Sequence, residues 1–506
     1  MRHRRILHIL AGIALPVAML LALLAWAGSS PPGSSPDDDY HMASIWCASG
    51  DVDGRCEQTS SPDRRGLPAE LVRASSCFAF LPDQSASCPV PHGMRSTDRG
   101  NWVGHAYPPY FYAVMNVFVT DDFDTSILLM RTFNAGLYVS VLTALFFLLP
   151  RRKRPLVVWT SLLTIVPLGT FLIPSVNPSG WAILSATGLW LAAWGFFLTS
   201  GTRKWLLAGM ALLLLLIGAG ARGDAAVYGV LALLAASVLG FRRDRRYLVE
   251  LLLPLGLSIV AVQMFFSVGQ SAIISGDTAV DASMPLSSLI FTNLKLLPQL
   301  WMGAFGLWGL GWLDTTMPGL VWGTTVGLFA ALCFWGLRRG DWRKFLALAG
   351  VGLALIVVPM YILVHDGMIV GSNVQPRYVY PMLIIFGGIA LVGFARSSLG
   401  LTRVQLIVAG AALALANAIA LHTNMRRYIT GLDVTNVNLN WPIDWWWNIP
   451  VSPMAWWLLG SAAFAAALAL AIWSAARRPA LEEAVSEPVA NDAVQEEVSP
   501  AESSRA

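Results

Sequence analysis

The chain has 506 residues, of which 56% are hydrophobic and only 13% are charged, whereas an ordinary soluble protein has about 25% charged residues. Apolar runs of about 20 residues recur along the chain, each long enough to cross a bilayer core of about 30 Å. This composition excludes a soluble enzyme and indicates an all-α, polytopic membrane protein. The net charge is only +4, so nucleic acid is not expected as a partner.

The first apolar stretch, residues 6–27, follows the basic sequence MRHRR and precedes small residues, as in a signal peptide. Because it is longer than a usual signal core, we favour an uncleaved first transmembrane helix within residues 1–27. The hydropathy pattern predicts about 12 spans in all. They cover roughly residues 6–27, 125–149, 156–174, 180–199, 205–221, 225–241, 247–268, 318–337, 345–364, 379–395, 404–421 and 454–476.

Clusters of Lys and Arg, such as RRKR at 151–154 and RRDRR at 242–246, all fall on one side of this topology. Basic loops are retained in the cytoplasm, so both termini are expected there. The chain shows no internal repeat, which disfavours repeat-built transporters. Three segments are then expected outside the membrane: 28–124, 269–317 and 422–453. After the first helix, the membrane blocks are 125–268, 318–421 and 454–476. Residues 477–506 are expected to form a disordered acidic tail.

Four of the five cysteines lie in the first outer segment, and an oxidising compartment favours two disulfides there. Three pairings are possible, and we favour the sequential one, Cys47–Cys56 with Cys77–Cys88. A zinc site is a weaker interpretation, because no CxxC or Cys/His spacing is present.

The stretch SSPPGSSPDDDYH, residues 29–41, follows directly after the first helix. Ser35 at the N-cap, Pro36 at N1 and Asp38 at N3 predict a capped helix start with a capping box. On such a helix Asp37 and His41 share a face. A carboxylate and an imidazole at headgroup height could serve as a base or hold a divalent cation, so this stretch is either a capped helix start alone or part of an active site.

Arg131 lies one to two turns inside the outer end of the second span, where an arginine is costly unless it is paired or sits in a polar cavity. It either snorkels outward or binds a phosphate, with Asn134 on the same face. In the short turn between two later spans, Arg222 and Asp224 are interpreted as a simple interfacial salt bridge.

Aromatic stretches mark the outer side. Residues 104–119, with His105 as a weak candidate ligand, are too short to span and predict a helix lying in the interface or packing over the loop. Residues 301–322, which contain Asp314, predict another interfacial element. Residues 440–450 are expected to anchor the chain in the interface, with an acceptor-sugar site as the alternative. Arg377 and Tyr378 lie at the outer end of the span expected at 379–395. Arginine is enriched on the cytoplasmic side of membrane proteins, so an arginine on the outer side is a candidate site residue.

These motifs resemble, in their order, a bacterial family of predicted membrane proteins of unknown function, which is itself similar to the GT-C superfamily of polyprenyl-phosphate-sugar-dependent glycosyltransferases. The resemblance runs over residues 31–381. Asp38 stands where the family pattern has Glu, and His105 lies two residues further from the prolines. The matching stretches are PDDDYH (36–41), HAYPPYFY (105–112), Arg131 with Asn134, NPSG (177–180), GWLDTTMP (311–318) and QPRYVYP (375–381).

The resemblance implies a GT-C-like fold in which a first-loop carboxylate, Asp37 or Asp38, is the general base or contacts a divalent cation, Mg²⁺ or Mn²⁺. It implies that Arg377 meets the donor phosphate. His41 would support the carboxylates, and the remaining candidate substrate-binding residues are Arg131, Asn134, Tyr378, His105 and Asp314.

We therefore expect a glycosyltransferase that moves a sugar from a polyprenyl-phosphate donor to an envelope glycan or lipid on the outer face of the membrane. Such a reaction needs a base for the acceptor hydroxyl and positive charge for the leaving phosphate. The alternatives are a transporter or flippase of an envelope lipid or polysaccharide, which needs ionisable groups near the midplane, and a non-catalytic anchoring protein that uses its acidic tail.

Overall fold

A computed structural model describes residues 2–89, 91–269, 284–372, 374–393, 399–442, 447 and 450–476. The expected disordered tail, residues 477–506, lies outside this part of the chain, as do residues 270–283 and most of 443–449. The structure is mostly helical, with these helices: α1 (Arg2–Gly28), α2 (Asp38–Trp46), α3 (Ala69–Arg73), α4 (Pro109–Asn116), α5 (Phe123–Leu148), α6 (Arg154–Thr164), α7 (Leu168–Leu172), α8 (Ser179–Leu198), α9 (Gly201–Ala221), α10 (Gly223–Gly240), α11 (Arg245–Glu250), α12 (Leu252–Phe266), α14 (Leu286–Gly303), α15 (Gly319–Gly336), α16 (Trp342–His365), α17 (Pro376–Ala390), α18 (Arg403–Ile429) and α19 (Pro453–Ala476).

Within the described residues, nine helical segments are long and apolar enough to cross a membrane: α5, α8, α9, α10, α11 with α12, α15, α16, α18 and α19. Each coincides with a span expected from the sequence. The first expected span corresponds to α1, whose apolar part Gly12–Gly28 is shorter. Large apolar side chains remain exposed on the peripheral helices, such as Phe266 on α12 and Phe334 on α15. This is the surface that lipid covers in a membrane protein.

Two of the expected spans do not form a single long helix in the structure. The span predicted at 156–174 is divided into α6 and α7 at Pro167. Proline has no backbone N–H to donate and so interrupts a helix. The span predicted at 379–395 is represented by α17, whose 15 residues reach only about 22 Å at 1.5 Å per residue.

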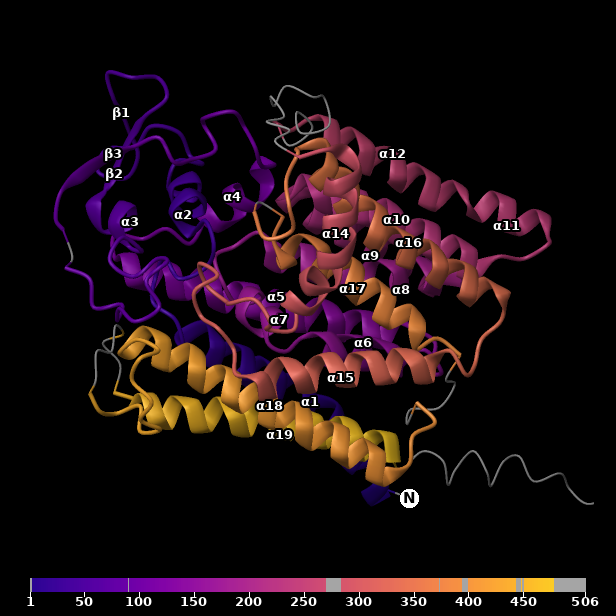
Figure 1. Ribbon diagram of the computed structural model, residues 1–506. Helices are drawn as coiled ribbons and strands as arrows, with labels where there is room; N and C mark the ends of the chain where they lie inside the picture. The colour runs from indigo at the N-terminus through magenta and orange to yellow at the C-terminus, as the bar shows by residue number, and fades with distance from the viewer. Residues whose placement is uncertain are drawn as a thin grey trace, which may run out of the picture.

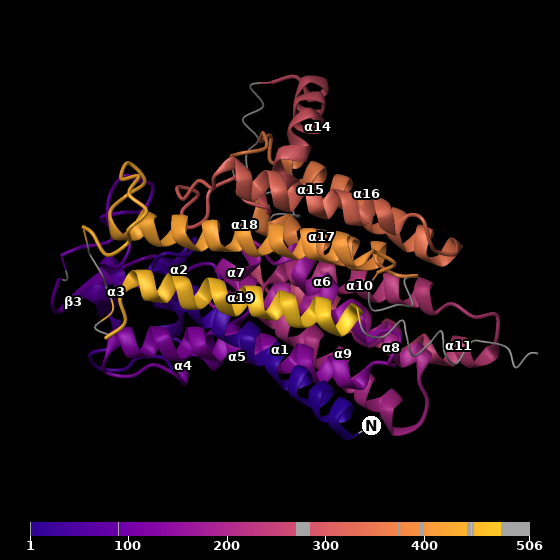
Figure 2. The same ribbon diagram turned by 90° about the horizontal axis from the view of Figure 1, so that it is seen from below.

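The long helices run in roughly the same direction in both views, and α14 crosses them (Figures 1 and 2). Nearly every residue of α8 is buried, so this helix forms the centre of the bundle. The helices α2, α3 and α4 gather with the small sheet at one end, and the N-terminus lies at the other. The basic connections that precede α6, α9, α11 and α16 lie at the end opposite α2.

The expectation of an all-α chain is wrong in the first outer segment, which contains a three-stranded antiparallel sheet in the order β1-β2-β3. Glu57 pairs with Gly66, and Gly66 with Ser96. These strands are too short to display an alternating apolar pattern over several residues, which is the sequence signal for a strand. Their bounds are β1 (Glu57–Gln58), β2 (Arg65–Pro68) and β3 (Met94–Thr97).

The sequential disulfide pairing is confirmed. Cys47 pairs with Cys56, with 5.2 Å between the Cα atoms, and Cys77 pairs with Cys88, with 5.6 Å. The first bridge joins the end of α2 to the sheet. The second closes a loop that packs through Phe78 against Tyr428 of α18. Both disulfides therefore close loops within the outer segment.

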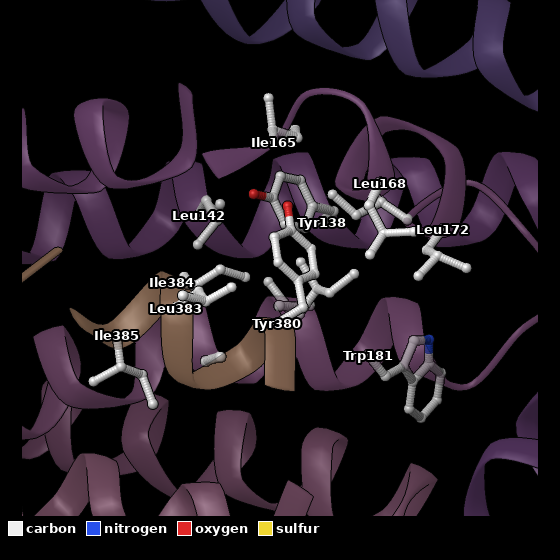
Figure 3. Close-up of a cluster of buried hydrophobic side chains, with 14 of the residues drawn as sticks. Tyr138, Leu142, Ile165, Leu168, Leu172, Trp181, Tyr380, Leu383, Ile384 and Ile385 are labelled. Atoms are coloured by element: carbon white, nitrogen blue, oxygen red, sulfur yellow. The ribbon is translucent and has the colours of Figure 1, made fainter. Parts of the chain in front are cut away.

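A buried apolar cluster lies between α5, α7, α8 and the first turns of α17 (Figure 3). The Tyr380 hydroxyl donates a 2.5 Å hydrogen bond to the Thr164 carbonyl at the break between α6 and α7. This packing fixes the start of α17, and therefore the position of the residues just before the cluster. The labelled members in Figure 3 are Tyr138, Leu142, Ile165, Leu168, Leu172, Trp181, Tyr380, Leu383, Ile384 and Ile385.

Candidate functional site

The strap that joins α1 to α2, residues 29–37, is held in place by Arg131 of α5. The Arg131 guanidinium donates to the carbonyls of Ala27 at 2.7 Å, Ser30 at 2.6 Å and Pro31 at 2.8 Å. The guanidinium is buried, so it neither snorkels outward nor faces an open phosphate site. It fixes an irregular backbone whose carbonyls lack helical partners. Arg131 therefore supports the strap in this structure, and its role in substrate binding stays a prediction.

Asp37 and Arg377 meet where this strap reaches the start of α17. A guanidinium nitrogen of Arg377 lies 2.5 Å from a carboxylate oxygen of Asp37, and another lies 3.2 Å from the carbonyl of Pro36. The Arg377 side chain is 3% exposed, whereas that of Asp37 is 34% exposed. The carboxylate thus stands at the surface of the site, with a buried cation behind it.

Burial opposes ionisation of Asp37, but Arg377 and the neighbouring Arg99 together hold the pKa of this carboxyl below its usual value. Arg99 lies 3.6 Å from Asp37 and 2.9 Å from Asp39, and it covers the ring of Tyr40. Asp39 is therefore paired with Arg99. Asp37 is negatively charged at neutral pH and is bordered by cations on two sides.

Asp37 also adopts a left-handed backbone conformation, with φ 60° and ψ 21°, and it occupies the N-cap position of α2. The predicted N-cap at Ser35 is wrong, because the chain turns at Asp37 and the helix begins at Asp38. One half of the predicted capping box is present: the Ser35 N–H donates to the Asp38 carboxylate at 2.9 Å. A non-glycine residue in this region costs free energy and occurs often at functional sites.

Asp38 points away from Asp37 and is completely buried. Burial raises the pKa of its carboxyl to about 7, although Arg131 and the Ser35 N–H both favour the charged form. One of its carboxylate oxygens has no hydrogen-bond partner among the described residues. The two aspartates considered together in the sequence therefore have different surroundings, and only Asp37 is partly open.

His41 lies one turn along α2 and is also completely buried. Its Nδ1 atom is 2.9 Å from the Tyr112 hydroxyl of α4, and its ring packs edge-on against Tyr107. Burial lowers the pKa of His41 to about 3, so the imidazole is neutral at physiological pH. Its Nε2 atom is buried and has no hydrogen-bond partner among the described residues.

Arg222, interpreted from the sequence as a simple salt bridge, belongs to this cluster. It pairs with Asp224 at 2.6 and 2.8 Å, and its guanidinium also lies 5.6 Å from the ring centre of Tyr107 and 5.0 Å from that of Tyr378. Burial raises the pKa of the Tyr107 hydroxyl, which keeps it protonated. Arg222 lies on the expected outer side, where arginine is unusual. The same signal that identified Arg377 in the sequence could therefore have identified Arg222.

Three other predicted substrate-binding residues do not join the cluster. Asn134 donates to the Ser175 carbonyl at 2.7 Å and accepts from the Trp181 indole at 2.9 Å. Asp314 forms a buried ion pair with Arg427 at 2.8 Å. His105 is exposed, in a left-handed turn. Of the predicted residues, the structure therefore brings together Asp37, His41, Arg377 and Tyr378, with Asp38 behind them.

The predicted divalent cation does not fit this set of ligands. The described residues contain no group of three or more His, Cys, Asp or Glu side chains placed to hold a metal ion. The oxygens of Asp37 face two guanidinium groups, which would repel a cation, and Asp38 is turned into the interior.

An apolar groove of about 330 Å³ begins beside the cluster, between α10, α12, α16 and α17. Tyr228 lines it and interacts electrostatically with Arg222 and Tyr378. Met382, one turn beyond Tyr378 on α17, lies on the opposite wall. The groove thus has apolar walls, and Tyr228 links it to the part of the cluster formed by Arg222 and Tyr378.

The fold defines a multi-pass integral membrane protein with a charged site at one end of the bundle. The chain belongs to the predicted membrane protein family DUF2142, whose model matches residues 20–386. The match covers all the residues of the cluster. Searches of curated proteins and of solved structures returned no match.

Proposed function

We propose that this protein is a glycosyltransferase that moves a sugar from a polyprenyl-phosphate donor to a cell-envelope glycan or lipid at the outer face of a bacterial cytoplasmic membrane. The observation that carries the proposal is the partly exposed Asp37 carboxylate, held against the buried Arg377 cation. An apolar groove lies between the neighbouring helices α10, α12, α16 and α17. A lipid-linked phosphate needs those two surroundings together, an apolar channel for its chain and fixed positive charge for its headgroup.

In the proposed reaction the acceptor hydroxyl oxygen attacks the anomeric carbon of the donor sugar. The bond from that carbon to the phosphate oxygen breaks, and its electron pair leaves with the polyprenyl phosphate. The proton of the acceptor hydroxyl passes to Asp37. Arg377, with Arg222 beside it, lies where it can stabilise the charge that develops on the phosphate.

The low pKa of Asp37 makes it a weak base in the free protein. A donor phosphate on Arg377 competes with the carboxylate for the same guanidinium, so donor binding raises the basicity of Asp37. The protonated Tyr107 hydroxyl can hydrogen-bond a sugar hydroxyl without carrying charge, and the buried neutral His41 imidazole packs behind the Tyr107 ring. This arrangement would couple proton acceptance to the presence of the donor.

The orientation of the protein across the membrane is part of the same proposal. The basic connections lie at the end opposite the cluster, and loops of this kind remain in the cytoplasm. Both termini would then be cytoplasmic and the cluster would face outward. Cysteine-directed labelling of Ser60→Cys, an exposed position in the outer segment, should succeed from outside intact cells with a reagent that does not cross the membrane.

The test is transfer from polyprenyl phosphates carrying radiolabelled hexoses or pentoses, with native envelope extract as acceptor and purified full-length protein as catalyst. Asp37→Asn should lower turnover by at least about 100-fold, the scale of a lost general base, while binding of the donor is retained. Asp433→Asn, which changes an exposed carboxylate outside the cluster, is the matched control.

Full activity of Asp37→Asn overturns the proposed role of Asp37. Donor translocation without sugar transfer in reconstituted vesicles would instead identify a flippase.

A further inference from the structure

A second cavity, of about 430 Å³, lies at the end of the bundle opposite the candidate site. Helices α1 and α19 form one wall and α5 and α6 the other. Exposed Gly12 and Phe147 lie on its rim, so the cavity is a groove that opens on the lipid-facing surface. Nothing in the proposed transfer reaction uses this groove.

The groove is apolar at depth and polar at its mouth. Met19, Leu142 and Ala467 line the deeper part, towards the middle of the bundle. Two polar residues also line the groove, Tyr138 and Ser161. Their hydroxyl groups lie 2.6 Å apart and form a hydrogen bond with each other, so these polar groups are partly satisfied without a ligand. The walls therefore suit a hydrocarbon chain that runs inward from the membrane surface.

One arginine lines the mouth of the groove, and two more precede it directly in the chain. Arg154 lines it and donates to the carbonyls of Leu149 and Phe147, which fixes the guanidinium on the wall. Arg151 and Arg152 precede it in the chain and are exposed. Positive charge is therefore present on the wall of the groove and in the two exposed residues that lead to it in the chain.

The charges nearby do not cancel this positive charge. Lys153 points to the ring of Trp194 at 4.2 Å and faces Asp341. The Asp341 carboxylate also approaches Arg343, so the acid is shared between two cations. The mouth thus keeps a net positive charge.

We propose that this groove binds an anionic phospholipid of the bilayer, with one acyl chain between the two walls and the phosphate near Arg151, Arg152 and Arg154. The headgroup charge is complementary to the mouth, and the chain direction matches that of a lipid in the leaflet at this end of the bundle. The bound lipid would join the α1–α19 pair to α5 and α6. This site is independent of the transferase proposal.

Native mass spectrometry of delipidated full-length protein tests the proposal, with phosphatidylglycerol and phosphatidylcholine of identical acyl chains as probes. One phosphatidylglycerol should bind at least about 5-fold more tightly than phosphatidylcholine and should raise the melting temperature. Leu470→Trp, which fills the groove, should abolish that binding. Ile407→Trp, on the lipid-facing surface of α18 and 59% exposed, should leave it unchanged.

Headgroup recognition is tested separately by Arg151→Ala with Arg152→Ala, which leaves the walls intact. This double variant should lose the preference for phosphatidylglycerol and keep weak binding of both lipids. Arg245→Ala with Arg246→Ala removes the same charge from the exposed start of α11, at the same end of the bundle, and should keep the preference. Equal binding of the two lipids to the wild type, or undiminished binding to Leu470→Trp, overturns the proposal.

Discussion

The Arg377 guanidinium lies 2.5 Å from the Asp37 carboxylate, although 340 residues separate them in the chain. The strap before α2 and the first turn of α17 bring them together. The strap is held by Arg131, and the start of α17 is held by the packing around Tyr380. Each partner of the ion pair is therefore positioned by contacts deeper in the bundle.

Replacing Arg377 with Gln should change the pH dependence of transfer. Because Arg377 lowers the pKa of Asp37, its loss should raise that pKa and move the acid limb of the kcat/KM profile to higher pH. The KM for the donor should also increase. An acid limb at the same pH in Arg377→Gln and wild type would show that Asp37 is not the group that titrates.

Replacing Asp38 with Asn should affect stability more than catalysis. The pKa of Asp38 is raised to about 7 from a usual 3.8, so its contribution to stability is fully present below about pH 4 and is lost as pH rises through 7. The variant, which keeps an acceptor for the Ser35 N–H, should melt at or above the wild-type temperature at pH 8. The advantage should shrink at pH 5, as measured by thermal unfolding in detergent.

His41 should make the wild type sensitive to acid. Its pKa is lowered to about 3, so the unfolded state takes up a proton first as pH falls below 6.5. At pH 5 this costs about 2 kcal/mol of unfolding free energy, at 1.36 kcal/mol per pH unit. His41→Gln should therefore lose less stability than the wild type between pH 8 and pH 5. Parallel melting curves for the two proteins at both pH values would contradict the assignment of a buried neutral imidazole.

Arg131→Met should lower the free energy of unfolding by about 3 kcal/mol, because three strap carbonyls lose a charged donor in a buried place. Chemical denaturation monitored by tryptophan fluorescence would measure the loss. Limited proteolysis should show faster cleavage near residues 29–37. The matched control is Arg243→Met, which makes the same change at an exposed position between α10 and α11 and should leave stability nearly unchanged. Equal stability of the two variants would contradict the support of the strap by Arg131.

Asp314→Asn should weaken the fold and leave donor affinity intact. Asp314 and Arg427 form a buried pair, with side chains 4% and 0% exposed, and removing one partner of such a pair costs about 3 kcal/mol or more. Asp314 also accepts from the Phe80 N–H at 3.1 Å, so the Cys77–Cys88 loop should loosen. A large increase in donor KM without a drop in melting temperature would restore Asp314 as a substrate-binding residue.

Much of the architecture was predictable because bilayer thickness imposes a length on each apolar helix. The expected spans at 180–199 and 345–364 correspond to α8 and α16. Cysteine position and spacing supported the two disulfides. The short sheet was not predictable, since strands of two to four residues carry no periodic pattern, and the break at Pro167 was hidden by continuous hydrophobicity.

Composition and local pattern alone determined that the chain is a multi-pass membrane protein and that Asp37, Asp38, His41 and Arg377 were residues of interest. They could not separate the two aspartates, because adjacent residues share a sequence context but point in different directions on a turn. Only the tertiary structure directed Asp37 towards two arginines and Asp38 into the interior. It also moved Asp314 and Arg131 into supporting contacts and brought Arg222 to the cluster, since burial and charge pairing depend on residues distant in the chain.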